Sequence, residues 1–212
     1  MSPEEVVRFL SERTRTNRDR RGGAGISSTL RVAIDGAAVA RPAALADAVA
    51  DVLIRLGVPA LRVQSESFFR AASLRFERGR DDPDAFYEDW LDESALLREV
   101  LVPLGPDGGG RYLPSRWDVT RDRATRAAYL VAPEGAVLLV DGTFLLGGPL
   151  PWDDSVHLAV SAPALERRTP ESDRWTLPAF ERYEREVSPA LRAGVVLLVD
   201  DPRHPALVED RS

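Results

Sequence analysis

Short apolar runs that almost lack polar alternation are the feature that most constrains how this chain folds. Five such runs occur, namely LRVAI (30–34), ALRVQS (60–65), GAVLLVDG (135–142), SVHLAVS (155–161) and AGVVLLVDD (193–201). A strand of this kind buries both of its faces, which is typical of parallel sheets covered by helices. Helical stretches separate the runs, so the pattern predicts an α/β doubly wound sandwich with a mainly parallel five-stranded sheet.

The segments between the runs divide into helices and loops. Helical periodicity predicts helices over 3–14, 42–56 and 84–103. The polar, Gly-rich segment 16–29 is interpreted as a connection, because it has no apolar periodicity. We therefore expect an N-terminal helix and polar connection over 1–29, followed by a single α/β domain over 30–212.

Acidic residues stand where the expected strands end. These ends carry Asp35-Gly36, Ser65-Glu66, Asp141-Gly142 and Asp200-Asp201. In open α/β sheets, ligands bind beyond the carboxyl ends of the strands. The sequence therefore predicts a small-molecule site at that edge of the sheet.

The composition excludes several classes of protein. The chain has no cysteine and only two histidines, which excludes disulfides and thiolate metal sites and argues against a multi-histidine metal site. No apolar run is long enough to span a membrane, and the charged N-terminus lacks the core of a signal peptide. A net charge of −6 argues against nucleic acid as the main partner. We expect a cytoplasmic protein with no nucleic-acid or membrane partner, and the oligomeric state stays open.

Several separated segments, in order, resemble the uridine kinase family of P-loop nucleoside kinases, especially its short actinobacterial members. The resemblance runs from about Leu30 to Pro205. The matching segments are RVAIDG (31–36), VQSESFFR (63–70), RGRDDPDAFYEDWLD (78–92), RYLPSRWDVTRDR (111–123), AVLLVDGTFLL (136–146) and AGVVLLVDDPRHP (193–205). The resemblance implies a P-loop NTPase-like fold and a nucleoside-like ligand.

The resemblance also implies roles for individual residues. Glu66 stands at the position of the general base, and Asp141 at the acidic position of the Walker B strand, where it would also hold Mg²⁺. Gly36 remains from the phosphate loop, and Arg167 and Arg168 resemble phosphate-facing arginines of the lid. The acceptor side is matched by Phe69, Asp81, Phe86 and Tyr87, and the base pocket by Trp117 and Asp118.

The phosphate loop departs from the family pattern. On G-x-x-x-x-G-K-[ST], residues 36–43 retain only the first glycine and place Arg41, Pro42 and Ala43 at the last three positions. Pro42 stands where the pattern has its lysine, and it has no backbone N–H to bind an anion. Ala43 stands where the pattern has Ser or Thr, so the hydroxyl that holds Mg²⁺ is missing. The chain contains no lysine anywhere. The helix itself should still form, because proline suits its first turn.

Three interpretations follow. The first is a kinase-like protein that has lost ordinary ATP-dependent transfer and retains an acceptor-side small-molecule pocket. The second is an unusual nucleoside kinase in which Arg41, or Arg167 with Arg168, replaces the lysine; only this one requires ATP and Mg²⁺. The third is a different enzyme that uses the carboxylates of Glu66, Asp81 and Asp141 for acid–base chemistry.

Overall fold

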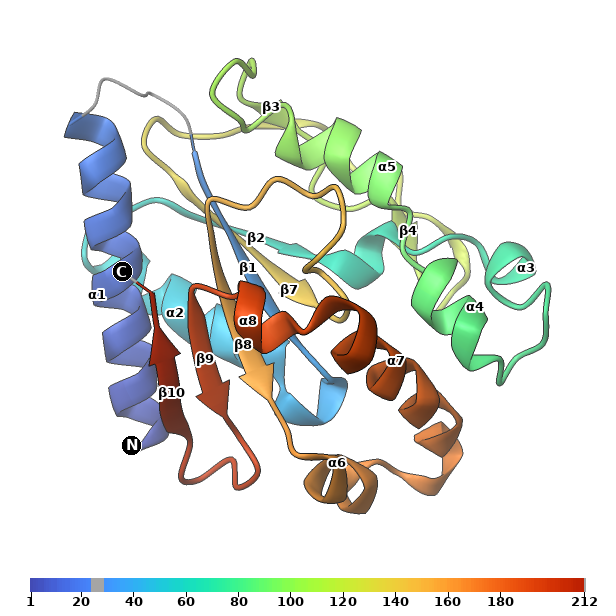
Figure 1. The fold of residues 1–212 in the computed structure, drawn as a ribbon. Helices are drawn as coiled ribbons and strands as arrows, with labels where there is room; N and C mark the ends of the chain where they lie inside the picture. Colours follow the sequence, from blue (N-terminus) through green and yellow to red (C-terminus); the bar gives the residue numbers. More distant parts are fainter. Residues whose placement is uncertain (24–28, 212) are drawn as a thin grey trace.

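A six-stranded sheet forms the centre of the protein in the computed structural model, which describes residues 1–23 and 29–211 (Figure 1). The strand order is β10-β9-β8-β1-β7-β2. The strands are β1 (Leu30–Gly36), β2 (Ala60–Gln64), β7 (Val137–Gly142), β8 (Asp154–Ala159), β9 (Val195–Leu198) and β10 (Ala206–Asp210). The first five are parallel, which confirms the five predicted strands.

The sixth strand, β10, was not predicted. It pairs antiparallel with β9 at the edge of the sheet. All five of its residues are exposed, so it has no buried apolar run to reveal it. Its place depends on main-chain hydrogen bonds to β9, which leave no mark in the residue pattern.

Eight α-helices and four helical segments of 3-10 or π type lie in the described part of the chain. The α-helices are α1 (Pro3–Gly23), α2 (Pro42–Arg55), α3 (Ala72–Arg75), α4 (Pro83–Glu88), α5 (Glu93–Leu96), α6 (Ala162–Arg168), α7 (Leu177–Val187) and α8 (Pro189–Arg192). The other segments are η1 (Ala38–Ala40), η2 (Ser65–Phe68), η3 (Leu97–Leu101) and η4 (Glu171–Thr176). Helix α2 confirms the predicted helix, with Pro42 in its first turn.

The first helix is nine residues longer than the predicted end at residue 14, because α1 continues to Gly23. The prediction of a loop from residue 16 is therefore wrong over 16–23, and residues 24–28 of the expected connection lie outside the described residues. The extension has no apolar stripe. Instead, Asn17 donates to Asp154 at 2.7 Å and Arg18 donates to the carbonyl of Gly135 at 2.8 Å. These tertiary contacts explain a helix that periodicity did not indicate.

The predicted helix over 84–103 is also interrupted. Helix α4 ends at Glu88, and α5 begins after Asp92, whose carboxylate accepts from the backbone N–H of Ala95 at 2.9 Å. This N-cap starts a new helix in a new direction. Helix α5 continues directly into η3.

Two apolar cores cover the two faces of the sheet. One contains Val6 and Leu10 of α1 with Val49 and Leu53 of α2. The other contains residues of α5, η3 and α7, among them Tyr183. Because both faces are covered, the central strands β1 and β7 are buried almost along their whole length. Figure 1 shows α2 and α7 on opposite sides of the sheet.

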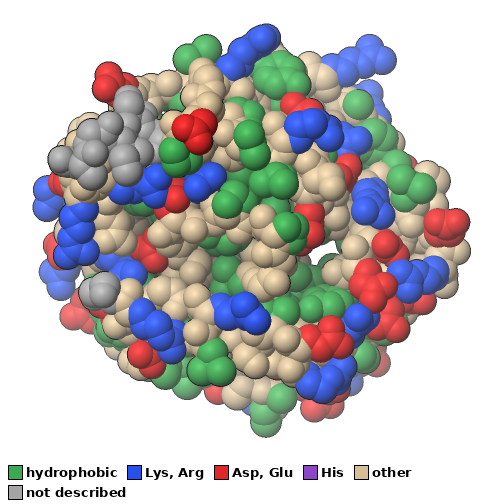
Figure 2. Space-filling model, turned by 45° about the horizontal axis from the view of Figure 1, so that its top comes forward, with side chains coloured by type: hydrophobic (Ala, Val, Ile, Leu, Met, Phe, Trp, Pro, Cys, Tyr) green, Lys and Arg blue, Asp and Glu red, His purple; other side chains and the backbone are tan. Residues whose placement is uncertain are grey.

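The segment 103–133 carries two short ladders, in which β3 (Arg111–Tyr112) pairs with β6 (Leu130–Val131) and β4 (Trp117–Asp118) with β5 (Arg123–Ala124). On the face of the protein seen in Figure 2, arginine side chains lie among acidic side chains. No helix in the described residues is long and apolar enough to cross a membrane.

Candidate functional site at the carboxyl edge of the sheet

The strand register brings three of the predicted acidic ends together. Asp35 on β1 pairs with Gly142 on β7 and with His157 on β8. Asp141, one residue before Gly142, pairs with Gln64 at the end of β2. The chemistry therefore gathers along the carboxyl edge of four adjacent strands, as expected for this topology.

The loop after β1 folds into a closed turn. Residues 38–40 form η1, and Arg41 adopts a left-handed conformation with φ of 60° before Pro42 begins α2. This is a conformation that favours glycine, and glycine is the residue the phosphate-loop pattern has here. A Cβ on Gly36 would lie 2.9 Å from Cβ of Leu158, so Gly36 also allows β1 and β8 to approach closely.

The side chain of Arg168, at the end of α6, binds this turn through a hydrogen bond. Its guanidinium donates to the carbonyl of Val39 in η1 and to the carbonyl of Val199 at 2.5 Å. Its neighbour Arg167 is exposed and donates to Pro163 at 3.4 Å. Helix α6 ends at Arg168, shortly before Pro170. Of the two paired arginines, Arg168 thus already binds backbone oxygens.

Asp141 is paired with an arginine. The guanidinium of Arg62 lies 2.6 Å from the buried Asp141 carboxylate and also contacts Asp47 at 2.9 Å. Burial raises the pKa of Asp141, and Arg62 opposes that rise. No group of three His, Asp or Glu side chains in the described chain has the arrangement of a metal site. With Ala43 lacking a hydroxyl and Asp141 bound to Arg62, these residues do not fit a Mg²⁺ ion.

Glu66 lies in η2, next to the Asp141 site. The Glu66 side chain reaches solvent. Partial loss of water around its carboxylate raises its pKa, and the nearby Asp141 charge raises the pKa further. Arg75 opposes both effects. Asp81 lies apart, exposed in the turn before α4. It is not among the charged groups that act on Glu66. The structure thus joins two of the three carboxylates proposed for acid–base chemistry.

The aromatic residues of the expected acceptor side pack on one another. Phe69 contacts Trp90 edge-on at 5.7 Å, and Phe86 contacts the same ring at 4.9 Å. Tyr87 and Phe86 both pack against Phe144, at 5.1 and 5.2 Å. These rings form a continuous aromatic layer, and Phe144 lines a cavity on its other side.

Trp117 and Asp118 form β4, in the segment 103–133. The indole N–H of Trp117 donates to Asp122 at 3.0 Å, and Asp118 accepts from Arg121 at 3.0 Å. Both residues are therefore held by neighbours on their own hairpin.

A cavity of about 460 Å³ opens between the ends of β1 and β8 and the helices α6 and α7. The sequence did not predict it. Its polar and charged lining residues are Asp35, His157, Glu181, Tyr183, Glu184 and Arg185. His157 was noted only as one of two histidines, and the signal that could have singled it out is its place beside Asp35 in the strand register.

Asp35 is completely buried and fully hydrogen-bonded. One carboxylate oxygen accepts from the backbone N–H of Leu145 at 2.9 Å. The other contacts Nδ1 of His157 at 2.7 Å and accepts from the hydroxyl of Tyr183 at 3.1 Å. The Tyr183 hydroxyl in turn accepts from the N–H of Leu146 at 3.1 Å. The five groups form one buried network.

His157 is positively charged at neutral pH in this network. Burial opposes its protonation, but the hydrogen bond to Asp35 and the nearby Glu184 carboxylate outweigh burial and raise the pKa to about 9. Burial and the Asp35 charge also raise the pKa of Tyr183. The ring nitrogen Nε2 of His157 is buried without a hydrogen-bond partner among the described residues.

The raised pKa predicts how stability depends on pH. Protonated His157 should stabilise the fold fully below its ordinary pKa of 6.5, and this contribution should disappear as the pH rises through about 9. We expect the free energy of unfolding to fall by on the order of 1–3 kcal/mol between about pH 6.5 and 9.5. Urea unfolding followed by tryptophan fluorescence measures it. His157→Gln should remove most of the fall and His204→Gln should keep it; an equal fall in His157→Gln would contradict the assignment.

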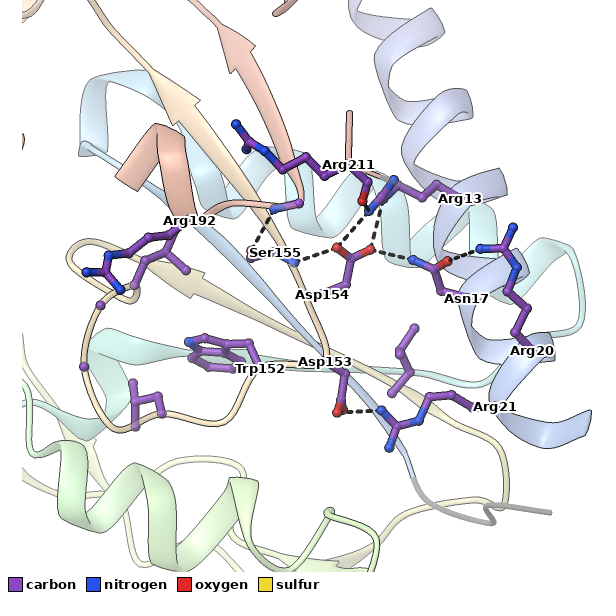
Figure 3. A pocket seen from close by; sticks show the side chains of 16 residues that line it. Arg13, Asn17, Arg20, Arg21, Trp152, Asp153, Asp154, Ser155, Arg192 and Arg211 are labelled. Atoms are coloured by element: carbon purple, nitrogen blue, oxygen red, sulfur yellow. Dashed lines mark hydrogen bonds and ion pairs between the residues drawn. The ribbon is translucent and has the colours of Figure 1, made fainter. Parts of the chain in front are cut away.

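A second cavity, of about 620 Å³, lies at the opposite edge of the sheet beside α1 (Figure 3). Figure 3 shows Arg13 and Asn17 of α1 pointing to Asp154, and Arg21 pointing to Asp153. Arg13 lies 3.0 Å from Asp154, and Arg21 lies 2.5 Å from Asp153. These ion pairs attach α1 to the sheet, so we assign this cluster a structural role.

Comparison with known proteins finds similar structures but no matching sequences. The sequence matches no family model and no curated protein. A possible uridine kinase from Bacillus stearothermophilus superposes with a TM-score of 0.65 and 16% identity, covering 86% of this chain and 97% of that one. D-glycerate 3-kinase from Cryptococcus neoformans gives 0.66 and 14%, covering 96% and 99%.

A candidate fructose transport system kinase from Silicibacter sp. gives a TM-score of 0.53 and 25% identity, covering 74% of this chain and 80% of that one. The descriptions of these three proteins name different small molecules. What they share with this chain is the central sheet and its flanking helices. The chain thus has the α/β fold of the P-loop small-molecule kinases.

Proposed function

We propose that this chain binds a small molecule at the carboxyl edge of its sheet and does not perform ordinary ATP-dependent phosphoryl transfer. The observation that carries this proposal is the bond from Arg168 to the carbonyl of Val39 in the loop after β1. A phosphate-binding loop points backbone N–H groups at the phosphates and adds a lysine and a hydroxyl. Here a carbonyl faces a guanidinium, Pro42 has no N–H, and Ala43 has no hydroxyl.

The acidic side of the site supports the same proposal. In phosphoryl transfer the metal neutralises charge that develops on the phosphate oxygens, which requires an acid free to bind it. Asp141 is bound to Arg62 at 2.6 Å. Releasing it would leave a buried carboxylate without its partner, at a cost of several kcal/mol.

The small-molecule part of the proposal rests on the cavity beside His157 and on the aromatic layer behind Phe144. A cavity of about 460 Å³ has the size of sites that enclose small ligands. The fold likeness to a possible uridine kinase makes a nucleoside the first ligand class to test.

Equilibrium calorimetry tests the proposal. We expect no binding of ATP at millimolar concentration, with or without Mg²⁺, because the loop lacks its anion donors and its cation. Uridine or a related nucleoside should bind without ATP. Tight Mg²⁺-dependent binding of ATP, together with nucleoside phosphorylation that Glu66→Gln abolishes, would refute it.

A second candidate is an unusual kinase that uses arginine in place of lysine. Arg41 favours it, because its exposed guanidinium has no partner among the described residues and lies at the edge of the loop. In this case Arg41→Ala should weaken ATP binding at least tenfold, since a guanidinium–phosphate contact contributes more than about 1.4 kcal/mol. Arg98→Ala, at another exposed arginine, is the matched control.

A further inference from the structure

We propose that the cavity beside His157 binds an uncharged molecule through a hydroxyl group that bridges His157 and Glu184. This inference rests on the small-molecule function proposed above and names the chemistry of the ligand. The cavity lies where β1 and β8 end, between α6 and α7. Among the buried side-chain polar atoms that line it in the described chain, one has no hydrogen-bond partner.

The exception is Nε2 of His157. Asp35 is fully buried, and both of its carboxylate oxygens are bound, by Leu145, Tyr183 and Nδ1 of His157, so it does not reach a ligand in the cavity. The His157 side chain is only 5% exposed, and its second ring nitrogen has no hydrogen-bond partner in the described chain. A buried donor without a partner is destabilising, and such groups are rare unless something binds them. Nε2 is therefore the donor that this cavity offers.

Glu184 determines what Nε2 can bind. Its carboxylate lies 3.8 Å from Nε2, which is too far for a direct hydrogen bond. A hydroxyl oxygen between the two can accept from Nε2–H and donate its own proton to Glu184. Groups that only accept and carry a negative charge, such as a carboxylate, would meet the negative charge of Glu184, whose side chain is 59% exposed. Groups that only donate, such as an ammonium, would leave Nε2 unpaired.

The other charges and the walls narrow the ligand further. Three acidic residues line the cavity, Asp35, Glu181 and Glu184, against two cations, His157 and Arg185, so the lining has a negative excess that disfavours anions. The rest of the lining is mostly apolar. It consists of Ala37, Phe144, Leu158, Val160, Ala162, Leu165 and Phe180, with Gly36. The surface fits a molecule that pairs an apolar face with a hydroxyl.

Nuclear magnetic resonance of the imidazole rings tests this directly, because the chain has only two histidines. His204 is exposed and serves as the internal reference. The probe is benzyl alcohol, with toluene lacking the hydroxyl and benzoate carrying a charge. We expect benzyl alcohol to shift the His157 ring signals saturably, at least about tenfold more tightly than toluene or benzoate, and to leave His204 unchanged.

Two glutamate variants on α7 complete the test. Glu184→Ala should weaken benzyl alcohol binding at least about fivefold, because it removes the acceptor beside Nε2. Glu181→Ala is the matched control, since it lines the same cavity and should bind like the unchanged protein. An absent or unsaturable His157 shift, an equal response to toluene, or equal effects of the two variants would overturn the inference.

The outcome stays separable from the proposed function. Calorimetry with ATP reports on the phosphate loop, whereas the histidine signals report on this cavity alone. ATP turnover together with a benzyl alcohol response of the His157 signals would refute the proposed function and support the hydroxyl-binding site. If neither ATP binding nor a His157 response is observed, only the proposal of a hydroxyl-binding site is refuted.

Discussion

Asp35→Asn is expected to lower the free energy of unfolding by about 3–5 kcal/mol, the range for breaking a buried charge pair from one side. Asp35 is fully buried and receives the N–H of Leu145, the hydroxyl of Tyr183 and Nδ1 of His157. An asparagine has one acceptor oxygen in place of two. Its NH₂ group would face two donors, and the His157 charge would lose its counter-charge.

Urea unfolding at pH 7 measures this loss. The matched control is Asp201→Asn, which alters the second Asp–His pair of the chain, with His204 at 3.0 Å. The side chains of His204 and Asp201 are 76% and 43% exposed, so solvent replaces what the mutation removes. A similar small change in both variants would mean that the buried network contributes little to stability. In Asp35→Asn we also expect the pKa of His157 to fall, which a titration of its ring signals would record.

Arg31→Met is expected to destabilise the protein by about 2–4 kcal/mol, because it leaves buried acceptors without their donor. The side chains of Arg31 and Asp153 are each 9% exposed. The guanidinium meets both carboxylate oxygens, at 2.9 and 3.0 Å, and the carbonyl of Leu101 at 3.1 Å. Arg21 remains bound to Asp153, which limits the loss.

Thermal or urea unfolding measures the effect, with Arg121→Met as its control. Arg121 also binds an aspartate, Asp118 at 3.0 Å, but its side chain is 68% exposed. We expect little change there, because exposed ion pairs add little to stability. Equal losses in the two variants would show that burial does not increase the contribution of the Arg31–Asp153 pair to stability.

The candidate site was predictable only in part. Glu66 and Asp141 could be located from sequence because both follow apolar runs, and the parallel topology then places them on one edge. Their surroundings were not predictable, because Arg62 reaches Asp141 from the neighbouring strand β2. The roles proposed for Arg41, Arg167 and the acceptor-side aromatics remain predictions. The cavity beside His157 combines β8, α6 and α7, which lie near one another in the sequence, with β1, which lies far earlier.

By itself, the sequence determined the fold class, the five parallel strands and helix α2. Those features depend on local patterns, namely apolar runs without alternation and a proline in a first helical turn, which a chain carries in its residue order. Tertiary structure alone decided the length of α1, strand β10, the contact of Arg168 with Val39 and the Asp35–His157 pair. Each of these depends on hydrogen bonds or charges between distant segments, and their register becomes defined only when the sheet forms.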